Sequence, residues 1–282
     1  MSEDRGLDSE SWALRLERGL ADAGIEARRA RRLAEESVAE ARDYARPPEE
    51  VYGPAEAYAQ ELARAARAAV RGERRSDGPH SGAPVLRLRD VSKRYGRKTV
   101  VRNVSLELKS GQIGAIVGAN GSGKSTLLKI CAGLVRATSG SVERVENVGY
   151  VPQAGGFSPL LTASEHFRLF GSLDGKNERE SLVAGTRLAQ SLGWRPSRKL
   201  GAARLSGGTQ QKLNVVLGGI NRPRLILLDE PYQGFDQGTY TDFWEQLFSW
   251  REAGAGVLVV THILHDLDGV DWTCELHPQE EL

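Results

Sequence analysis

The chain has few cysteines, no long apolar stretch and no leader-like N-terminus, and each shortage excludes a class of protein. Only two cysteines, Cys131 and Cys274, occur among its 282 residues, far apart and without metal-site spacing. This favours a reducing compartment and a core position for both. No run reaches about 18 apolar residues, the usual length of a membrane span, and the N-terminus lacks a basic region followed by an apolar one. We therefore expect a cytoplasmic protein, which can still sit on a membrane through another chain.

The chain also lacks an excess of charge of either sign. Its formal net charge is +1 at pH 7. Proteins that bind nucleic acid mainly through the phosphate backbone carry a basic face, so we expect no nucleic acid as the main partner. The length allows one large domain with a substantial core and one small domain.

Composition divides the chain into two parts and a linker. Residues 1–74 are rich in Ala, Arg and Glu with apolar residues at steps of three and four, which predicts a small helical domain with mixed charges on its solvated faces. We expect its helices near Ser11–Ala23, Glu26–Ala45 and Pro54–Val70, with a turn, "RPPEEVYGP", joining the last two. Residues 75–84 are expected to be a flexible linker, and residues 85–282 a second domain.

The second domain alternates strand and helix patterns. The segments "VLRLRDV" and "VVRNVSLEL" alternate apolar with polar residues, as half-buried antiparallel strands do. By contrast, "IGAIVG", "LILL" and "GVLVVTH" are continuous apolar runs, which is typical of buried strands. The pattern predicts an α/β fold whose sheet carries an antiparallel edge.

A complete P-loop pattern, "GANGSGKST", follows the strand "IGAIV" and leads into a helix. Its glycines let successive amides point at one place, toward which the helix also directs its positive end. Lys124 is expected to reach the terminal phosphates of a nucleotide, and Ser125 to offer its hydroxyl to Mg²⁺. The residues expected to bind the nucleotide here are Gly118, Asn120, Gly121, Ser122, Gly123, Lys124, Ser125 and Thr126.

Two adjacent carboxylates, Asp229 and Glu230, end the apolar run "RLILLDE". The end of a buried parallel strand opens onto a ligand crevice, so the pair is expected beside the P-loop. Asp229 then suits the role of Mg²⁺ anchor, and Glu230 that of the general base that activates a water for hydrolysis. Taken alone, the same letters could form a helix N-cap.

A second glycine-rich element, "LSGGTQQK", also precedes a helix. Ser206, Gly207 and Gly208 would present a hydroxyl and amides at a helix start, which makes a second anion site in the same chain. One nucleotide does not need two such sites.

With these motifs in order over Val85 to Leu276, the chain resembles the nucleotide-binding subunit of an ABC transporter, a P-loop ATPase core with a helical subdomain. The resemblance implies that the signature segment faces the P-loop of a partner ATPase subunit across ATP, so two ATPase domains pair head to tail. It further implies roles for four residues: Tyr95 stacks on adenine, Gln153 senses Mg²⁺ and the γ-phosphate, Asp236 closes the loop after the acidic pair, and His262 contacts the γ-phosphate during catalysis. Outside this set Tyr95 would be an ordinary strand aromatic and His262 a core histidine. No motif supports a functional role for His166, His265 or His277, and we expect these three to be structural.

The resemblance implies an ATPase that drives a separate transmembrane permease and lies on the inner face of the cell membrane. The segment "LTASEHFRLFGSLDG" is similar to that of multidrug or ABC-2-type exporters, which favours export over import. The alternatives are a soluble ABC ATPase that switches ribosomes or DNA, and a nucleotide-binding regulator that hydrolyses poorly. The cargo, and whether two copies or two different chains pair, are not encoded here.

Two features depart from the family's pattern or extend it. The segment "PYQGFD" places the bulky residues Tyr232, Gln233 and Phe235 at the expected dimer seam. The N-terminal segment "PPEEVYGPAEAYAQELA" resembles the end of a HAAS-type module, which suggests a docking or regulatory element; a solubilising or dimer-stabilising role is the alternative.

Overall fold

The computed structural model describes residues 3–43, 47–60, 63, 82–232, 234–261 and 269–277. They form two compact units, one of N-terminal helices and one that contains the strands. The expected linker, apart from residues 82–84, lies outside the described residues. We describe each unit by itself.

The N-terminal unit is helical, as its spacing predicts. Its helices are α1 (Glu3–Asp22), α2 (Ala27–Asp43) and α3 (Pro48–Tyr52), followed by helical residues 55–60. Trp12, Leu16 and Leu20 recur every four residues on one face of α1 and are at most 1% exposed. The Trp12 indole donates a 2.9 Å hydrogen bond to the carbonyl of Gly53. Ala30 and Ala34 of α2, and Ala55, Tyr58 and Ala59 of the helical stretch after Pro54, complete this core.

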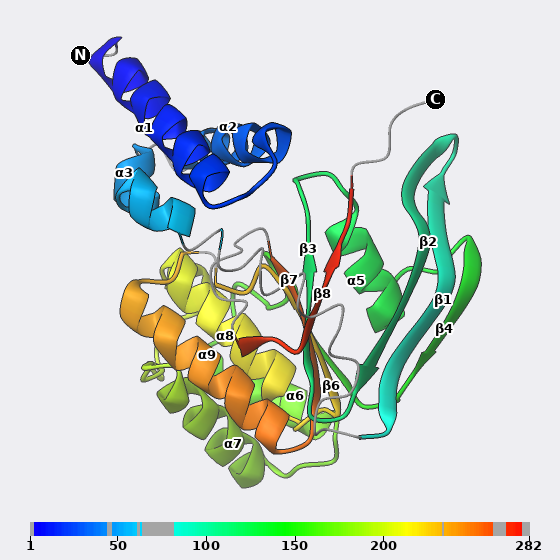
Figure 1. Ribbon diagram of the computed structural model, residues 1–282. Coiled ribbons are helices and arrows are strands. Elements are labelled where there is room, and N and C mark those ends of the chain that lie inside the picture. Colours follow the sequence, from blue (N-terminus) through cyan, green and yellow to red (C-terminus); the bar gives the residue numbers. More distant parts are fainter. Residues whose placement is uncertain are drawn as a thin grey trace. The chain divides into compact units, whose positions relative to one another are not determined.

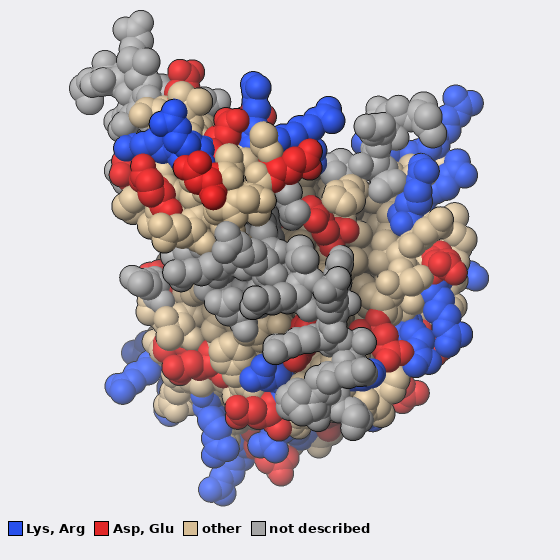
Figure 2. Space-filling model, viewed as in Figure 1, with Lys and Arg blue, Asp and Glu red and all other residues tan. Residues whose placement is uncertain are grey.

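The segment expected to be a turn contains the short helix α3. Pro48 is its first residue, a position that tolerates proline because no hydrogen bond is needed from that nitrogen. The next helical stretch begins directly after Pro54. Acidic and basic side chains alternate over the surface of these helices (Figure 2), and Arg31 and Glu35 form an ion pair one turn apart at 3.0 Å. The mixed charges therefore form solvated faces, as expected.

Three antiparallel strands form a sheet of their own in the second unit. They are ordered β2-β1-β4, with bounds β1 (Pro84–Tyr95), β2 (Lys98–Lys109) and β4 (Ser139–Arg144). β1 pairs antiparallel with both neighbours. The alternating segments do make antiparallel strands, but this separate sheet replaces the simple edge that the sequence suggested.

A parallel five-stranded sheet carries the continuous apolar runs. Its order is β5-β6-β7-β3-β8, with bounds β3 (Ile113–Val117), β5 (Val148–Val151), β6 (Leu225–Asp229), β7 (Gly256–Thr261) and β8 (Trp272–Glu275). Every residue of β3, β6 and β7 is buried. Because all pairings are parallel, the carboxyl ends of these strands share one edge.

Helices cover both faces of the parallel sheet (Figure 1). α5 (Lys124–Ala132) lies between the two sheets, where Leu127, Leu128 and Cys131 join the core. α8 (Gly207–Gly219) and α9 (Gln237–Glu252) cover the opposite face, and α6 (Ala163–Ser172) and α7 (Glu178–Ser191) pack beyond α8. A short 3₁₀ helix, Ala202–Arg204, precedes α8. These helices are the expected helical subdomain beside the sheet.

The two cysteines take the core positions expected of them. Cys131 is fully buried, and burial raises the pKa of its thiol to about 12. Cys274 packs, half-buried, against the same core. In the part of the chain that the structure describes, no helix has the length and apolarity needed to cross a bilayer.

Candidate functional site

The expected site residues meet at the carboxyl edge of the parallel sheet. The P-loop follows β3, Gln153 follows β5, and the acidic pair ends β6. β5 and β6 are paired neighbours, while β7 separates β6 from β3. The side chains nevertheless reach one another across this edge.

The backbone of the P-loop needs its glycines. Gly118, Gly121 and Gly123 have φ angles of 151°, 79° and 96°, a region that other residues rarely adopt. A side chain at Gly118 would lie 2.2 Å from the carbonyl oxygen of Leu276, and one at Gly123 would lie 2.3 Å from that of Val100. The loop is therefore packed from outside by β2 and by the end of β8, and it leads directly into α5.

Two polar groups inside this loop suit an anionic ligand. The ammonium group of Lys124, only 5% exposed, donates to the carbonyls of Gly118 and Ala119 at 2.6 and 3.0 Å. The buried hydroxyl of Ser122 lies next to Gly118 and has no hydrogen-bond partner among the residues that the structure describes. A buried hydroxyl without a partner is costly, and a phosphate oxygen would satisfy it. The loop thus fits a polyphosphate.

Asp229 is joined to the P-loop by its carboxylate. Ser125 Oγ donates a 2.9 Å hydrogen bond to Asp229 Oδ1, and Asp229 is 2% exposed. Burial raises the pKa of Asp229 above its ordinary value; the Ser125 hydrogen bond opposes this shift, and the neighbouring Glu230 adds to it. A hydroxyl and a buried carboxylate held together in this way are the oxygen ligands that Mg²⁺ prefers.

Glu230 turns away from its neighbour and takes a different partner. Its φ angle of 45° is uncommon for a residue with a side chain, and its amide is fixed by a 3.0 Å hydrogen bond to the carbonyl of Val260. Gln153 Nε2 donates to Glu230 Oε2 at 2.9 Å. Neither acid caps a helix, since the next helix, α9, starts after Asp236. The N-cap explanation of the acidic pair is therefore wrong.

Buried polar residues that sequence reasoning missed hold the loop that carries Gln153. Gln211 Nε2 donates to the carbonyl of Pro152 at 3.4 Å, and Asn214 donates to Gln211 at 3.0 Å. Both lie on the buried face of α8, one turn apart. Polar residues at this spacing inside an apolar helix were the signal available in "TQQKLNVV".

His166 fixes the same loop from α6. It is 1% exposed; its Nε2 accepts a 3.0 Å hydrogen bond from the amide of Ser158, and its Nδ1 lies 2.8 Å from the carbonyl of Thr162. Because a carbonyl only accepts, Nδ1 carries the proton. His166 is thus structural, as expected, but what it supports is the loop after Gln153.

The second glycine-rich element starts α8. Ser206 is the N-cap and accepts a 3.3 Å hydrogen bond from the amide of Thr209, while Gly207 and Gly208 form the first helical residues. A side chain at Gly208 would lie 2.5 Å from the carbonyl oxygen of Gly234. The start of α8 therefore touches the loop that follows Glu230.

The residues assigned through the family resemblance are more dispersed. Tyr95 ends β1, 52% exposed, with Lys93 Nζ 4.8 Å from its ring centre. Asp236 caps α9 by accepting from the amide of Thr239 at 2.8 Å, and this hydrogen bond lowers the pKa of Asp236. His262, His265 and Gln233 lie outside the described residues.

The bulky residues after the acidic pair pack inward. Tyr232 is 6% exposed, with its ring 5.5 Å from that of Tyr240 and 6.2 Å from that of Phe243. Phe235 lies 5.9 Å from Phe243. These rings anchor the loop onto α9, so less of their bulk than expected is available to a facing subunit.

Comparisons with known proteins find similarity to ABC transporter proteins. Residues 101–233 match the ABC transporter family. The chain is 31% identical over 183 residues to human ATP-binding cassette sub-family A member 9, covering 62% of this chain and 11% of that protein. It is 31% identical over 196 residues to the Nod factor export ATP-binding protein I of Cupriavidus metallidurans, covering 65% of each chain. The chain therefore spans less than two thirds of either relative.

A solved structure shows the same fold. It is that of a dimeric bacterial ABC transporter cassette, which superposes with a TM-score of 0.61 at 26% identity and covers 68% of this chain and 94% of the other.

Proposed function

We propose that the chain belongs to an ABC transporter, and that it binds and hydrolyses ATP to drive transport through a separate membrane permease; the match of residues 101–233 to the ABC transporter family supports this. One observation carries the proposal. Ser125 of the P-loop is hydrogen-bonded to Asp229, while Glu230, the residue after Asp229, accepts a hydrogen bond from Gln153. A phosphate cradle, a metal ligand pair and a candidate base thus share one edge of one sheet.

In this proposal different side chains bind the phosphates, accept the proton and hold the metal ion. Lys124 and the P-loop amides hold the phosphates, and the Ser122 hydroxyl contributes a further donor. Glu230 accepts the proton of the attacking water, and Gln153 orients the Glu230 carboxylate through their hydrogen bond. Ser125 and Asp229 would hold Mg²⁺, with Gln153 nearby; this ion neutralises charge on the phosphate oxygens when bound. Three further residues complete the proposed site. Tyr95 stacks on the adenine, Asp236 closes the loop after the acidic pair, and His262 contacts the γ-phosphate.

We propose that two such domains pair head to tail, because Ser206, Gly207 and Gly208 lie at the start of α8, where they would form a second anion site. The solved relative described above is itself dimeric, which supports pairing. The pair can consist of two copies of this chain or of two different chains.

The permease is proposed to dock on the helical subdomain. Leu160, Leu169 and Leu173, around α6, are 87%, 48% and 76% exposed. An apolar surface of this kind suits a protein partner. The relative from Cupriavidus metallidurans is named for export, which favours export for this chain and a place on the inner face of the membrane.

The change Glu230→Gln tests the base. It should lower ATP turnover by about two to four decades, the usual contribution of a general base, while ATP binding persists. The measurement is phosphate release per chain at saturating ATP, with binding followed by a fluorescent ATP analogue. Lys124→Ala is the control and should lose binding instead. Normal turnover by the Glu230→Gln chain would show that another group is the base.

The alternative, a soluble switch acting on ribosomes or DNA, has less support. The relatives described above are named as a cassette protein and as an export protein, and the net charge of +1 offers no general attraction to phosphate backbones. Salt-sensitive association of the purified chain with ribosomes would favour this alternative, whereas co-purification with a permease would favour transport.

A further inference from the structure

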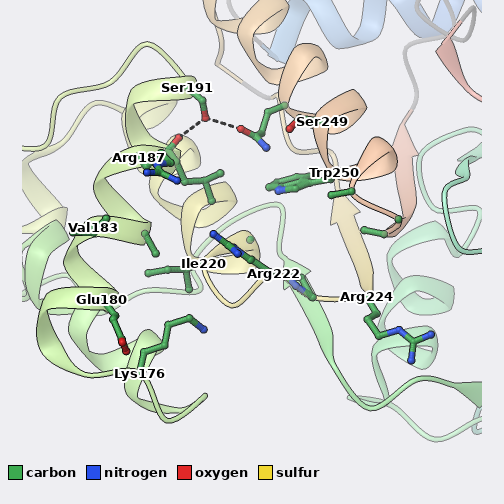
Figure 3. A pocket seen from close by; sticks show the side chains of 18 residues that line it. Lys176, Glu180, Val183, Arg187, Ser191, Ile220, Arg222, Arg224, Ser249 and Trp250 are labelled. Atoms are coloured by element: carbon green, nitrogen blue, oxygen red, sulfur yellow. Dashed lines mark hydrogen bonds between the residues drawn. The ribbon is translucent and has the colours of Figure 1, made fainter.

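A groove lies at the opposite end of the elements that build the nucleotide site. Its volume is about 940 Å³, and it is lined by α7, by the end of α8 with the turn before β6, and by the end of α9 (Figure 3). α8, β6 and α9 each reach the nucleotide site with their other end. α8 has 13 residues, so the groove lies about 20 Å from Ser206 along that helix.

The floor of the groove is apolar and rigid. Trp250 extends from α9 toward α8, and Trp250 and Ile220 are 8% and 3% exposed. The indole lies against α8 because Gly219 has no side chain; a Cβ there would be 2.5 Å from the ring. Val183, on α7, adds a 53% exposed apolar side chain.

Most of the charged side chains around this floor are arginines, and these arginines can bind a ligand. Arg187, Arg222 and Arg224 line the groove and make no hydrogen bond or ion pair through their guanidinium groups with any residue that the structure describes. Figure 3 shows Arg187 and Arg224 on different sides of the indole. Cations spread in this way do not converge on a single phosphate group.

The other charged residues of the lining are already engaged. Lys176 is bonded to Asp174 and, at 3.0 Å, to Asn221 Oδ1. Glu180 accepts a 3.0 Å hydrogen bond from the amide of Asn177 and so caps α7. Among the residues that the structure describes, Glu180 is the carboxylate of the lining, and it forms no ion pair with the three arginines.

The backbone fixes two of these arginines. The amide of Arg222, whose φ angle is 48°, donates to the carbonyl of Gly219 at 3.0 Å. Arg224 donates to the carbonyl of Asn147 at 3.1 Å and accepts from the amide of Gly256 at 2.9 Å. A fixed backbone reduces the ordering cost of binding.

We propose that this groove docks an acidic peptide segment of a partner protein, with one bulky apolar side chain on Trp250 and carboxylates on the arginines. Guanidinium groups bind carboxylates through paired hydrogen bonds, and Trp and Arg are the side chains that dominate binding energy at protein interfaces. The separated cations match carboxylates spaced along a peptide better than one compact anion. The inference does not depend on ATP hydrolysis.

Fluorescence anisotropy with the full chain tests the proposal. The probes are three fluorescein-labelled octapeptides of alternating Asp and Glu with Leu, Phe or Trp at one central position. At least one should bind saturably, and Arg187→Glu and Arg222→Glu should each weaken it about tenfold or more. Val183→Asp, an exposed change on the floor, should also weaken binding. Basal ATPase activity should stay at the wild-type level in all three variants.

Arg179→Glu is the matched control, because Arg179 is an exposed arginine of α7 outside the groove. It should leave binding within about twofold, and a peptide with Ala at the central position should bind at least tenfold more weakly than the best probe. The proposal fails if none of the three probes binds saturably, if Arg179→Glu weakens binding as much as Arg187→Glu, or if the Ala peptide binds equally well. Binding of phosphatidylglycerol vesicles, but not of peptides, with sensitivity to the same arginines would assign the groove to a membrane surface instead.

Discussion

At the scale of single residues, the two acidic side chains at the end of β6 have different hydrogen-bond partners. Asp229 and Glu230 are adjacent in sequence, yet one faces Ser125 and the other Gln153. Glu230 has a left-handed φ of 45° directly after the strand. Sequence motifs predicted both acids, but no motif encodes their separate hydrogen-bond partners.

The raised pKa of Asp229 has a consequence for stability. The folded chain binds this proton more tightly than the unfolded chain, so the stability that the site contributes is complete below the ordinary pKa of 3.8 and is lost as the pH rises through the higher folded value. Asp229→Asn removes the charge and can still accept from Ser125. We expect the variant's melting temperature to rise above that of wild type increasingly between about pH 4 and neutrality, while Mg²⁺-dependent ATPase activity is lost.

Thermal melts of the nucleotide-free chain across that range measure this difference. Glu252→Gln, which removes an exposed carboxylate at the end of α9, is the control and should follow wild type. A difference between Asp229→Asn and wild type that stays constant or shrinks with rising pH would contradict the assignment.

At the scale of elements, continuous apolar runs predicted the buried strands β3, β6 and β7, because a strand covered on both faces has no polar side. Alternation predicted the antiparallel pairing of β1 and β2 but not that they form a separate sheet, since alternation does not say which sheet a strand joins. Helix α3 was missed because proline and glycine around it indicate a turn as readily as a short helix.

The packing of α7 on α6 reverses an expectation based on helix propensity. Gly185 lies inside α7, where alanine would ordinarily stabilise the helix by about 1 kcal/mol. A Cβ at Gly185 would, however, lie 2.3 Å from the ring of Phe167, which is fully buried. We therefore expect Gly185→Ala to lower the free energy of unfolding by about 1–3 kcal/mol, as overpacking does.

Urea denaturation measures this change. Gly238→Ala, in the first turn of α9, is the matched control, since its nearest neighbouring atom is 3.7 Å from the added Cβ. That variant should be neutral or slightly more stable. Stabilisation by both alanines would mean that α6 and α7 pack less closely than described here.

At the scale of the whole molecule, the proposed function requires a second ATPase domain. With ATP and Mg²⁺, the Glu230→Gln chain should form dimers, because ATP joins the two domains and is not consumed. Light scattering after size exclusion would show the doubled mass, and the double variant Lys124→Ala with Glu230→Gln should stay monomeric under the same conditions. A Glu230→Gln chain that remains monomeric with ATP, both alone and with its permease, would argue against head-to-tail pairing.

The sequence predicted the motif residues of the candidate site but not the groove around Trp250. Motif residues are constrained by the ligand and can be identified one by one, whereas the groove around Trp250 forms from the ends of three elements far apart in the sequence. No local pattern marks Gly219 as the residue that admits the indole. The spacing of Gln211 and Asn214 in an apolar helix indicates buried polar residues, but which loop these two and His166 support is recognisable only once their partners are known.

The close approach of Gly208 to the Gly234 carbonyl has a mechanical consequence for the proposed pair of ATPase domains. In the proposed pair, the segment of one chain that would face the neighbour's nucleotide rests on the loop that follows Glu230, the proposed base of the same chain. A shift of that loop during turnover in one active centre would be transmitted directly to the opposite one. We therefore expect ATP hydrolysis at the two sites to be cooperative. A side chain placed at Gly208 should remove this cooperativity.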